Sequence, residues 1–345
     1  MFFASDNTSG VHPKIMEALA EANSGFAPAY GNDHYTGALQ ERLRDMFDAP
    51  DARVYPMTSG TGANAALLAA MTPPWGVIYC HETAHIEVDE RGAATFYAGG
   101  AKLKALPSQN SRIDADLLRA KVSEDRSNTD VHGMPPAAVS LTNLTEFGEL
   151  YTPAQIAEIA TASALPVHFD GARFANAMAT SGASPWEMTR ELSTLSLGAT
   201  KTGAMAAEAA VVFDPELAQA FESQRMRGGH NISKARFVSA QILAWLENDL
   251  WLELAAHANA MAARLSAGIT DLGGHLNYSV DGNMIFATLP RAKHAQAKAK
   301  GAVYHIWGAD TALTDDPDTP QMARFVASWS TTPAHVDALL AAFAD

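Results

Sequence analysis

The sequence predicts an α/β protein with a mostly parallel central sheet and a smaller C-terminal α+β unit. Short apolar runs rich in Val, Ile and Phe alternate with longer Ala-rich segments of helical period, which is typical of strands joined by crossover helices. After about residue 240 this alternation gives way to a long helical stretch followed by short strands. We therefore expect a large domain at residues 1–240, including an N-terminal arm, and a small domain at residues 241–345.

The elements of the large domain follow from these periods. Buried strands are expected at residues 53–57, 77–80, 137–142, 167–170, 194–198 and 209–213. Helices are expected at residues 63–71, 113–122 and 153–164. Thr152 and Pro153 suit the cap and the first position of the last of these helices. Residues 123–136 are polar and end in two prolines, which predicts a surface loop.

The small domain begins with the long helical stretch. We expect a helix at residues 240–272, strands at 276–279 and 284–289, a solvated helix at 292–301 and a terminal helix from Pro333. No internal repeat is visible in the sequence.

Composition excludes several classes of protein. The 345-residue chain carries 24 Lys+Arg against 38 Asp+Glu, a net charge of -14, which argues against a nucleic-acid surface. Its single cysteine, Cys80, follows an apolar run and excludes a disulfide framework or a cysteine-based zinc site. The start of the chain lacks the pattern of a signal peptide, and no apolar run is long enough to cross a membrane. We expect a cytoplasmic protein with no membrane partner.

Residues 58–62, Thr-Ser-Gly-Thr-Gly, lie between an expected strand and an expected helix. Glycines there allow a ligand to approach the backbone, and the helix N-terminus offers free N–H groups to an anion. Ser59 and Thr61 add hydroxyl groups. The segment is neither a Walker A loop nor a dinucleotide fingerprint, so a phosphate site and a plain turn both remain open.

Asp170 and Lys201 each follow an expected strand. An acid at the carboxyl end of a central strand lies where open α/β sheets bind ligands. Asp170 could be a metal ligand, a base, the partner of a protonated heterocycle, or only a helix cap. Lys201 lies among small residues, where a desolvated amine could form a Schiff base, although a surface lysine is the commoner case.

The order of these features along the chain is more informative than any one of them. A phosphate loop, an aspartate at a strand end and a lysine match the needs of pyridoxal phosphate: an anion site, a carboxylate that keeps the pyridine nitrogen protonated, and an amine that holds the aldehyde carbon. His85 also follows a strand and could stack on the pyridine ring.

The chain resembles the low-specificity L-threonine aldolases, which are fold-type-I pyridoxal phosphate enzymes related to the β-eliminating lyases. The resemblance covers nearly the whole length. The segments that carry it are residues 3–10, 29–33, 59–64, 82–87, 168–173, 198–201 and 323–329. It implies the fold-type-I architecture and cleavage of L-threonine, L-allo-threonine or a related β-hydroxy-α-amino acid to glycine and an aldehyde, through an external aldimine with the cofactor.

The resemblance also implies roles for residues around the cofactor. Lys201 would form the Schiff base, Asp170 would pair with the pyridine nitrogen, and His85 would stack over the ring. The phosphate would be held by residues of two loops, namely Ser59, Gly60, Thr61 and Thr200.

Three further residues are implied at the substrate. Arg173 would lie near the phenolate oxygen of the cofactor and the substrate, in a catalytic position. Ser5 and Arg324 would bind the α-carboxylate, a task that suits a guanidinium group.

The sequence departs from the family pattern at two places. Many members have a histidine near the substrate hydroxyl after the strand at 137–142, where this chain has Thr145. The base for that hydroxyl is therefore open, with His85 or a bound water as candidates. Many members also supply a phosphate-binding arginine from a neighbouring subunit. Here Lys234 is the expected substitute, with Arg225 and Arg227 as alternatives.

The family implies a homo-oligomer, dimer or tetramer, with shared active sites. Alternatives remain on the same scaffold: another pyridoxal phosphate-dependent lyase, a transaminase or an inactive cofactor-binding homologue. An α/β module that binds a phosphorylated metabolite is an alternative of another class.

Overall fold

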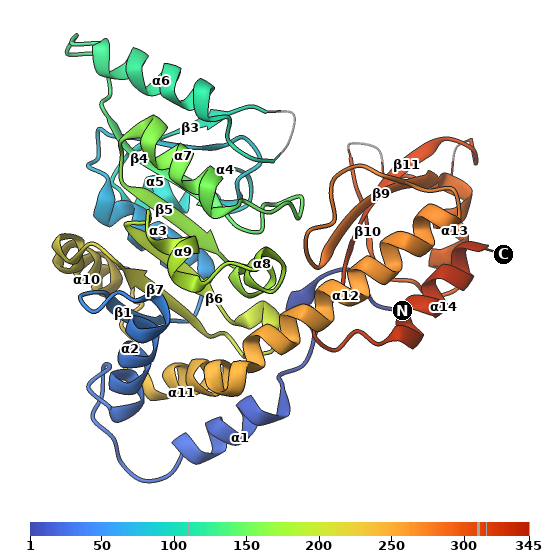
Figure 1. The fold of residues 1–345 in the computed structure, drawn as a ribbon, viewed down its shortest axis with the longest axis horizontal. Coiled ribbons are helices and arrows are strands. Elements are labelled where there is room, and N and C mark those ends of the chain that lie inside the picture. The colour runs from blue at the N-terminus through green and yellow to red at the C-terminus, as the bar shows by residue number, and fades with distance from the viewer. Residues whose placement is uncertain (109–110, 309–310, 315, 345) are drawn as a thin grey trace.

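The chain folds into two units joined by one long helix, α12 (Leu250–Asp271) (Figure 1). The computed structural model describes residues 1–108, 111–308, 311–314 and 316–344. The large unit is built on a seven-stranded sheet and the small unit on a four-stranded one.

The large sheet has the strand order β1-β7-β6-β5-β4-β2-β3. Its strands are β1 (Arg53–Met57), β2 (Val77–His81), β3 (Lys102–Leu106), β4 (Pro136–Thr142), β5 (Val167–Gly171), β6 (Thr194–Gly198) and β7 (Glu208–Val212). The pairs β2–β3, β2–β4, β4–β5 and β5–β6 are parallel, and only β7 runs against its neighbours. The prediction of a mostly parallel sheet is confirmed. Strand β3 was missed because it lies at the edge, where its lysines meet solvent and its sequence lacks a long apolar run.

Helices cover both faces of this sheet. One face carries α3 (Gly60–Met71), α5 (Ala93–Tyr97) and α10 (Ala218–Arg227), and α3 contacts the other two. The main core joins the other face to a second group of helices. That group comprises α1 (Pro13–Ala22), α2 (His34–Phe47), α6 (Ala115–Ser127), α7 (Pro153–Ser163), α8 (Phe174–Ser181), α9 (Pro185–Thr189) and α11 (Arg236–Leu246). The result is a three-layer α/β unit, as the sequence predicts.

Local sequence explains where two of these helices begin and end. Helix α7 begins at Pro153, with the Thr152 side chain capping it and Gln155 completing a capping box. The surface loop expected at residues 123–136 is wrong over its first five residues, because α6 continues to Ser127. In α6 only Leu118 and Val122 are fully buried, and the polar residues of its last turns face solvent. The end of this helix therefore resembles a polar loop in the sequence.

The small unit is antiparallel, with strand order β10-β11-β9-β8. Its elements after α12 are β8 (His275–Leu276), β9 (Met284–Pro290), α13 (Arg291–Ala299), β10 (His305–Ile306), β11 (Pro320–Val326) and α14 (Pro333–Ala344). The strand expected at 276–279 is wrong beyond Leu276.

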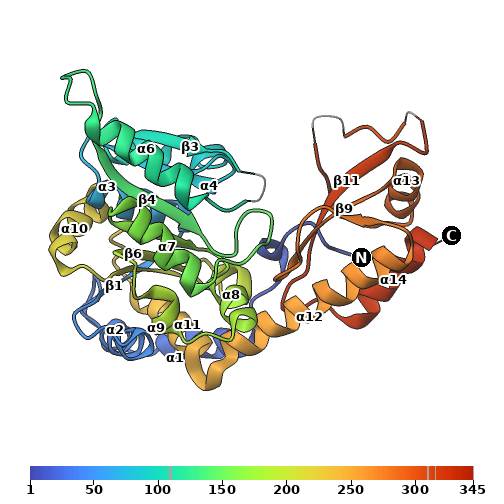
Figure 2. The ribbon, with the colours of Figure 1, turned by 45° about the horizontal axis from the view of Figure 1, so that its top comes forward.

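The helix expected at 240–272 is also wrong as one element, because α11 and α12 are separated at Asn248 and Asp249. Both residues have left-handed backbone conformations, with φ of 50° and 56°. This break turns the chain, so that α11 packs against α1 and α2 while α12 runs to the small unit (Figure 2).

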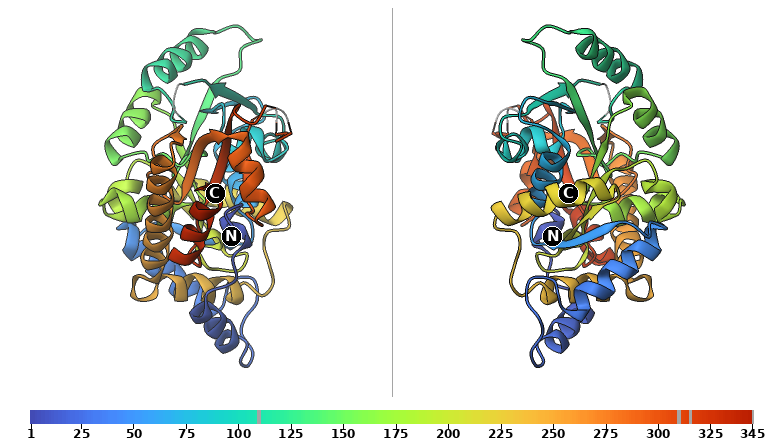
Figure 3. Two further views of the ribbon diagram at one scale, coloured as in Figure 1. Left: turned by 90° about the vertical axis from the view of Figure 1, so that its right-hand side faces the viewer. Right: turned by 90° about the vertical axis from the view of Figure 1, so that its left-hand side faces the viewer.

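The hydrophobic residues form separate cores in the two units. Along α12, Ala255 belongs to the first core and Ala262 to the second. Phe3 also lies in the second core, and its N–H donates to the Val303 carbonyl at 2.7 Å. Both ends of the chain therefore lie at the small unit (Figure 3). We propose that the units divide within α12, and not at residue 240 as expected.

Within the described residues, no helix combines the length and the apolar character that spanning a membrane requires.

Candidate active site

The predicted site residues meet at one edge of the large sheet. Strands β1, β4, β5 and β6 end at this edge, and the antiparallel strand β7 begins there. A cavity of about 310 Å³ opens at this edge. Its lining includes Ser59, Gly60, Thr61, Asn64, His85, Glu90, Glu146, Asp170, Arg173, Thr200, Lys201 and Glu208.

The N-terminus of α3 forms one wall of the cavity. Ser59 caps the helix, and its hydroxyl oxygen accepts a hydrogen bond from the Gly62 N–H at 3.4 Å. The N–H groups of Gly60 and Thr61 have no acceptor within the helix because they lie in its first turn. A Cβ added at Gly60 would point into open space, whereas one at Gly62 would lie 2.4 Å from the ring of His230. This wall is suited to an anion.

Asp170 lies at the base of a buried polar network. The Asn64 amide donates to Asp170 at 2.8 Å and to Glu90 at 3.1 Å, and Glu90 is 2.9 Å from His85 Nδ1. The hydrogen bond to Glu90 raises the pKa of His85. Burial lowers the pKa of His168, which is 3.2 Å from Asn64 Oδ1, to about 4, so this ring is neutral. The network therefore fixes Asp170 and His85 relative to each other.

Lys201 lies in the short helix η2 (Thr200–Thr202) that follows β6. Burial lowers the pKa of its amine, and the charge of Arg173 lowers it further. Glu208, the first residue of β7, accepts a hydrogen bond from the Thr200 hydroxyl at 2.6 Å. Burial raises the pKa of Glu208 to about 7. Lys201 therefore has an environment that favours its neutral, nucleophilic form.

Arg173 is held from the N-terminal arm. Its guanidinium donates two hydrogen bonds to Asp6, at 2.8 and 3.0 Å. Burial opposes ionisation of Asp6, but the charges of Arg173 and Lys201 outweigh it and lower the pKa of the carboxyl. Asn283 of the small unit donates to the same carboxylate at 2.9 Å. Asp6 thus joins the arm, the large unit and the small unit beside the cavity.

Arg324 lies near this cluster without lining the cavity. It donates to the Ala4 carbonyl at 3.2 Å. Burial lowers the pKa of Arg324, with a contribution from the charge of Arg173, so the two cations are close in space. In the described part of the chain, its buried Nε has no hydrogen-bond partner. An anion would satisfy that group.

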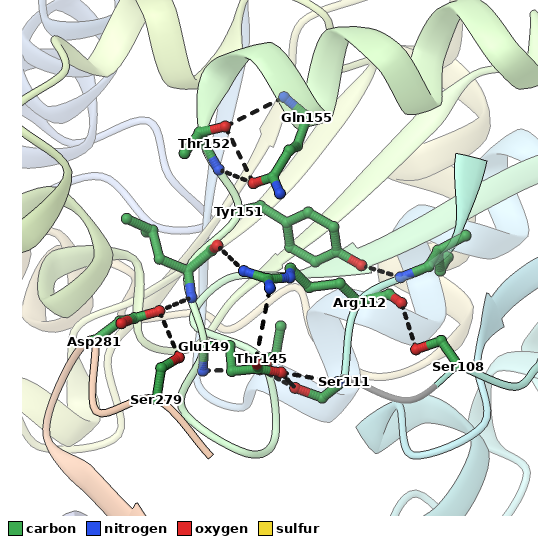
Figure 4. A network of polar contacts seen from close by, with 12 residues as sticks. Ser108, Ser111, Arg112, Thr145, Glu149, Tyr151, Thr152, Gln155, Ser279 and Asp281 are labelled. Carbon is green, nitrogen blue, oxygen red and sulfur yellow. Dashed lines mark hydrogen bonds and ion pairs between the residues drawn. The ribbon is translucent and has the colours of Figure 1, made fainter. Parts of the chain in front are cut away.

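In the loop between β4 and α7, the residue that faces the cavity is not the one expected. Thr145, expected at the place of the family histidine, is buried within the loop, where its hydroxyl is 2.5 Å from that of Ser111 (Figure 4). Its neighbour Glu146 lines the cavity instead. The Glu146 carboxylate accepts hydrogen bonds from the His85 N–H at 2.7 Å and the Thr142 hydroxyl at 2.9 Å.

The cavity thus brings together eight of the expected site residues. These are Ser59, Gly60, Thr61, His85, Asp170, Arg173, Thr200 and Lys201. Ser5, Arg324 and Lys234 do not line it. Ser5 caps the short helix η1 (Asp6–Thr8), and Lys234 is exposed on the loop before α11.

The two alternatives to Lys234 lie elsewhere as well. Arg225 is buried and donates to the Pro56 carbonyl at 3.1 Å, and Arg227 donates to Gln224 at 3.4 Å. Neither side chain lines the cavity.

Several lining residues were not predicted from the sequence, among them four with polar side chains that enter the network described above. Asn64, Glu90, Glu146 and Glu208 are polar residues buried or half-buried beside the predicted ones. Asn64 ends the segment 59–64, Glu146 directly follows Thr145, and Glu90 follows His85 by five residues. Asparagine and glutamate are common at protein surfaces, so these residue types did not by themselves indicate a buried position at the site.

Comparison with known proteins identifies the family. The sequence model of the beta-eliminating lyases matches residues 3–292. The chain belongs to the beta-eliminating lyase family. A low-specificity L-threonine aldolase of Pseudomonas sp. is 34% identical over 98% of this chain and 96% of the relative. Another, from Pseudomonas aeruginosa, is 35% identical over 95% of this chain and 93% of the relative. The expected resemblance to low-specificity L-threonine aldolases is confirmed.

Solved structures place this beta-eliminating lyase in the same fold. A threonine aldolase of Leishmania major has a TM-score of 0.91 at 24% identity, over 99% of this chain and 98% of that one. A structure of SPT with a PLP internal aldimine has a TM-score of 0.72 at 15% identity, over 100% of this chain and 86% of that one. The expected fold-type-I architecture is confirmed.

Proposed function

We propose that this protein is a pyridoxal phosphate-dependent aldolase that cleaves L-threonine, L-allo-threonine or a related β-hydroxy-α-amino acid to glycine and an aldehyde. The observation that carries the proposal is the meeting of Lys201, Asp170, His85 and the N-terminus of α3 around one cavity. The kinship with low-specificity L-threonine aldolases supports the substrate class.

The donor set of the cavity fits pyridoxal phosphate. The α3 N-terminus offers N–H groups to the phosphate, and the Ser59, Thr61 and Thr200 hydroxyls lie in the same lining. Asp170 provides a carboxylate for the pyridine nitrogen, and Lys201 provides an amine whose lowered pKa favours attack on an aldehyde. When bound, the cofactor supplies an electron-accepting ring that stabilises negative charge at the substrate Cα.

The protein's own residues then select the bond that breaks. Arg173 and Arg324 hold the α-carboxylate, and the unpartnered Nε of Arg324 provides a donor for it. Ser5 adds a hydroxyl from the N-terminal arm. Fixing the carboxylate sets the rotation about the bond between nitrogen and Cα, so that the Cα–Cβ bond can align with the ring's π system.

The decisive experiment uses the purified protein with pyridoxal phosphate. Incubation with L-threonine, L-allo-threonine and phenylserine is expected to yield glycine and the corresponding aldehyde in equal amounts. A 2-oxo acid with ammonia would instead identify an eliminating lyase, and an amino-group transfer product would identify a transaminase. Lys201→Ala is expected to abolish cleavage and the visible absorbance of the bound cofactor, whereas a wild-type protein that stays colourless would contradict the cofactor assignment.

We also propose a homo-oligomer, dimer or tetramer, with shared active sites. The cations in the cavity lining of one subunit are Lys201 and Arg173, within the described residues. Lys201 is assigned to the aldehyde and Arg173 to the substrate, so charge at the phosphate would come from the partner subunit's Lys234. Lys234→Gln is expected to weaken cofactor binding without changing the sedimentation coefficient, and a monomer in sedimentation would contradict sharing.

We further propose a cytoplasmic location. The single cysteine, Cys80, is a buried free thiol, which suits a reducing compartment. Cell fractionation followed by immunodetection tests this location.

A further inference from the structure

We propose that Glu146 is the base that takes the proton from the β-hydroxyl group of the substrate, an inference that rests on the proposed aldolase function. Glu146 lies at the same edge of the sheet as Asp170 and Lys201. Glu146 follows β4 and Lys201 follows β6, with Asp170 on β5 between them. All three side chains line the same cavity. Glu146 is therefore placed to reach a group on Cβ while Lys201 serves Cα.

The orientation of the Glu146 carboxylate leaves one oxygen for a ligand. Both the His85 N–H and the Thr142 hydroxyl donate to Oε1, at 2.7 and 2.9 Å. No other residue donates to Oε2 in the described part of the chain, and the remaining hydrogen bond to the carboxylate comes from the backbone N–H of Glu146 itself. A hydroxyl group in the cavity can donate to Oε2 without displacing either existing bond.

The loop that carries Glu146 is held in place on both sides (Figure 4). On one side the Glu149 carboxylate accepts hydrogen bonds from the Ser111 N–H at 2.9 Å and the Ser111 hydroxyl at 2.8 Å. On the other side, the Leu150 N–H donates to Asp281 of the small unit at 2.9 Å. A carboxylate on a fixed loop can act as a positioned base, because its geometry is set before the substrate binds.

The proton affinities separate Glu146 from the alternative base. Burial raises the pKa of Glu146 to about 7, close to the value that suits a general base at neutral pH. The hydrogen bond to Glu90 raises the pKa of His85, so that its ring holds a proton over more of the neutral range. The ring also has its Nδ1 engaged at 2.9 Å by that carboxylate. His85 is thus the poorer acceptor of the two.

The step balances without a further reactant. The O–H bond of the β-hydroxyl breaks and its proton passes to Glu146 Oε2. The electron pair of that bond forms the C=O bond of the aldehyde, and the Cα–Cβ pair remains with Cα. After the aldehyde leaves, Cα takes up a proton to give glycine, and Glu146 loses its proton to water. No oxidant or reductant is consumed.

The test compares two reactions of the holoenzyme, of which only one involves a hydroxyl group. Cleavage of L-threonine is followed by aldehyde release, and exchange of the α-proton of glycine in D₂O is followed by NMR. In Glu146→Gln we expect cleavage to fall by about 10²-fold or more while exchange stays within about threefold, since only cleavage needs the β-hydroxyl proton. Glu146→Asp, which keeps the carboxylate, is expected to recover part of the cleavage rate.

The pH dependence provides a second readout. Wild-type cleavage is expected to rise with pH through about 7, where Glu146 loses its proton, and this limb is absent in Glu146→Gln. The titratable groups that face Glu146 are His85 on α4 (His85–Val88), Asp170 on β5, Cys80 on β2 and Tyr151 in its own loop. All of them are retained in the variant, so loss of the limb belongs to Glu146.

A third readout does not depend on turnover. An infrared pH titration of the apoprotein is expected to show carboxyl absorbance that titrates near pH 7, from Glu146 and Glu208 together. Glu146→Gln is expected to remove the Glu146 part of this signal and to leave that of Glu208. If that variant does not fold, Thr142→Val serves instead: it removes a donor to the carboxylate and is expected to move the cleavage limb to higher pH.

Glu87→Gln is the matched control, because Glu87 is exposed on the same helix as His85 and does not line the cavity. Its cleavage rate is expected to equal that of the wild type. Unchanged cleavage in Glu146→Gln, or a parallel loss of cleavage and exchange, would overturn the proposal. Wild-type protein that releases no aldehyde would instead overturn the proposed function itself.

Discussion

At the scale of single residues, the site is governed by carboxyl groups whose charge depends on burial. Glu146 and Glu208 have pKa values raised to about 7, whereas the neighbouring cations lower the pKa of Asp6 against the effect of burial. Carboxyl groups in and beside one cavity therefore differ in charge. Sequence reasoning found the residues with a distinctive chemistry, such as Lys201 and Asp170, but it could not identify carboxylates whose role arises from burial.

Replacement of Glu90 by Gln is expected to lower the pKa of His85. The hydrogen bond that the His85 ring donates to Glu90 is the main cause of the raised pKa, and burial opposes it. A histidine whose pKa is raised in the folded protein stabilises the fold at low pH, and this stabilisation is lost as pH rises through the pKa of the folded state. The variant should therefore also be less stable than the wild type at acidic pH. NMR titration of the His85 ring in the apoprotein measures the pKa. An unchanged value would contradict the role of Glu90, and exposed Glu87→Gln is the control.

Replacement of Glu146 by Gln is expected to stabilise the fold at pH 8. The carboxyl keeps its proton in the folded protein up to about pH 7, but releases it near the ordinary value of 4.5 in the unfolded chain. Between these values the folded state binds more protons, so the free energy of unfolding falls as pH rises. The variant should gain roughly 2–3 kcal/mol at pH 8 and nothing below pH 4.5.

Urea unfolding of wild type and variant at both pH values measures this difference. Glu208 titrates in the same range but is present in both proteins, so its contribution cancels. Equal free energies of unfolding for the two proteins at pH 8 would contradict the prediction, because they would show that ionisation of Glu146 does not destabilise the folded state.

At the scale of elements, the junctions between strands and helices place the chemistry. The ends of β1, β5 and β6 deliver the Ser-Gly-Thr loop, Asp170 and Lys201 to one edge of the sheet. Sequence reasoning placed these junctions because each is a local pattern of strand, small residues and helix. It missed short helices such as α4 and the edge strand β3, whose patterns are too brief or too polar to be distinguished.

Replacement of Gly62 by Ala is expected to damage the phosphate end of the site. The new Cβ would lie 2.4 Å from Cε1 and 2.7 Å from Nε2 of the His230 ring, so the ring must shift, which disturbs its 3.2 Å contact with the Tyr97 hydroxyl. We expect a loss of roughly 1–3 kcal/mol in unfolding free energy and weaker cofactor binding. Gly37→Ala in α2 is the control, because nothing lies within 4 Å of its Cβ, and it should gain about 0.5–1 kcal/mol. Equal effects of the two substitutions would contradict the close packing of α3 on His230.

At the scale of the whole molecule, the two units meet through the loop that carries Glu146. Phe147 stacks on Tyr278 with a centroid distance of 4.3 Å and contacts Phe286 at 5.1 Å, both in the small unit. Asp281 and Asn283 add hydrogen bonds from the small unit to this loop and to Asp6. The small unit thus supports the active site as well as forming a core of its own.

Replacement of Phe147 by Ala is expected to loosen the contact between the units. Loss of these aromatic contacts should cost roughly 2 kcal/mol in unfolding free energy and increase hydrogen exchange of residues 143–151. Urea unfolding and hydrogen-exchange mass spectrometry measure both effects. Phe96→Ala, at a side chain that is 80% exposed, is the control and should change stability by less than about 0.5 kcal/mol. Unchanged exchange in the loop would show that Phe147 does not hold it.

Local periodicity and the order of the motifs were sufficient to predict the α/β class, the strand-end positions of Lys201 and Asp170, and the family. The tertiary structure alone decided that Thr145 faces the loop and Glu146 faces the cavity, and that Glu90 and Asn64 connect His85 to Asp170. It also decided that the arm residue Asp6 holds Arg173. These contacts join residues that are distant in the sequence, and burial at the contacts sets the charges of the side chains. Neither the contacts nor the burial can be deduced from a local sequence pattern.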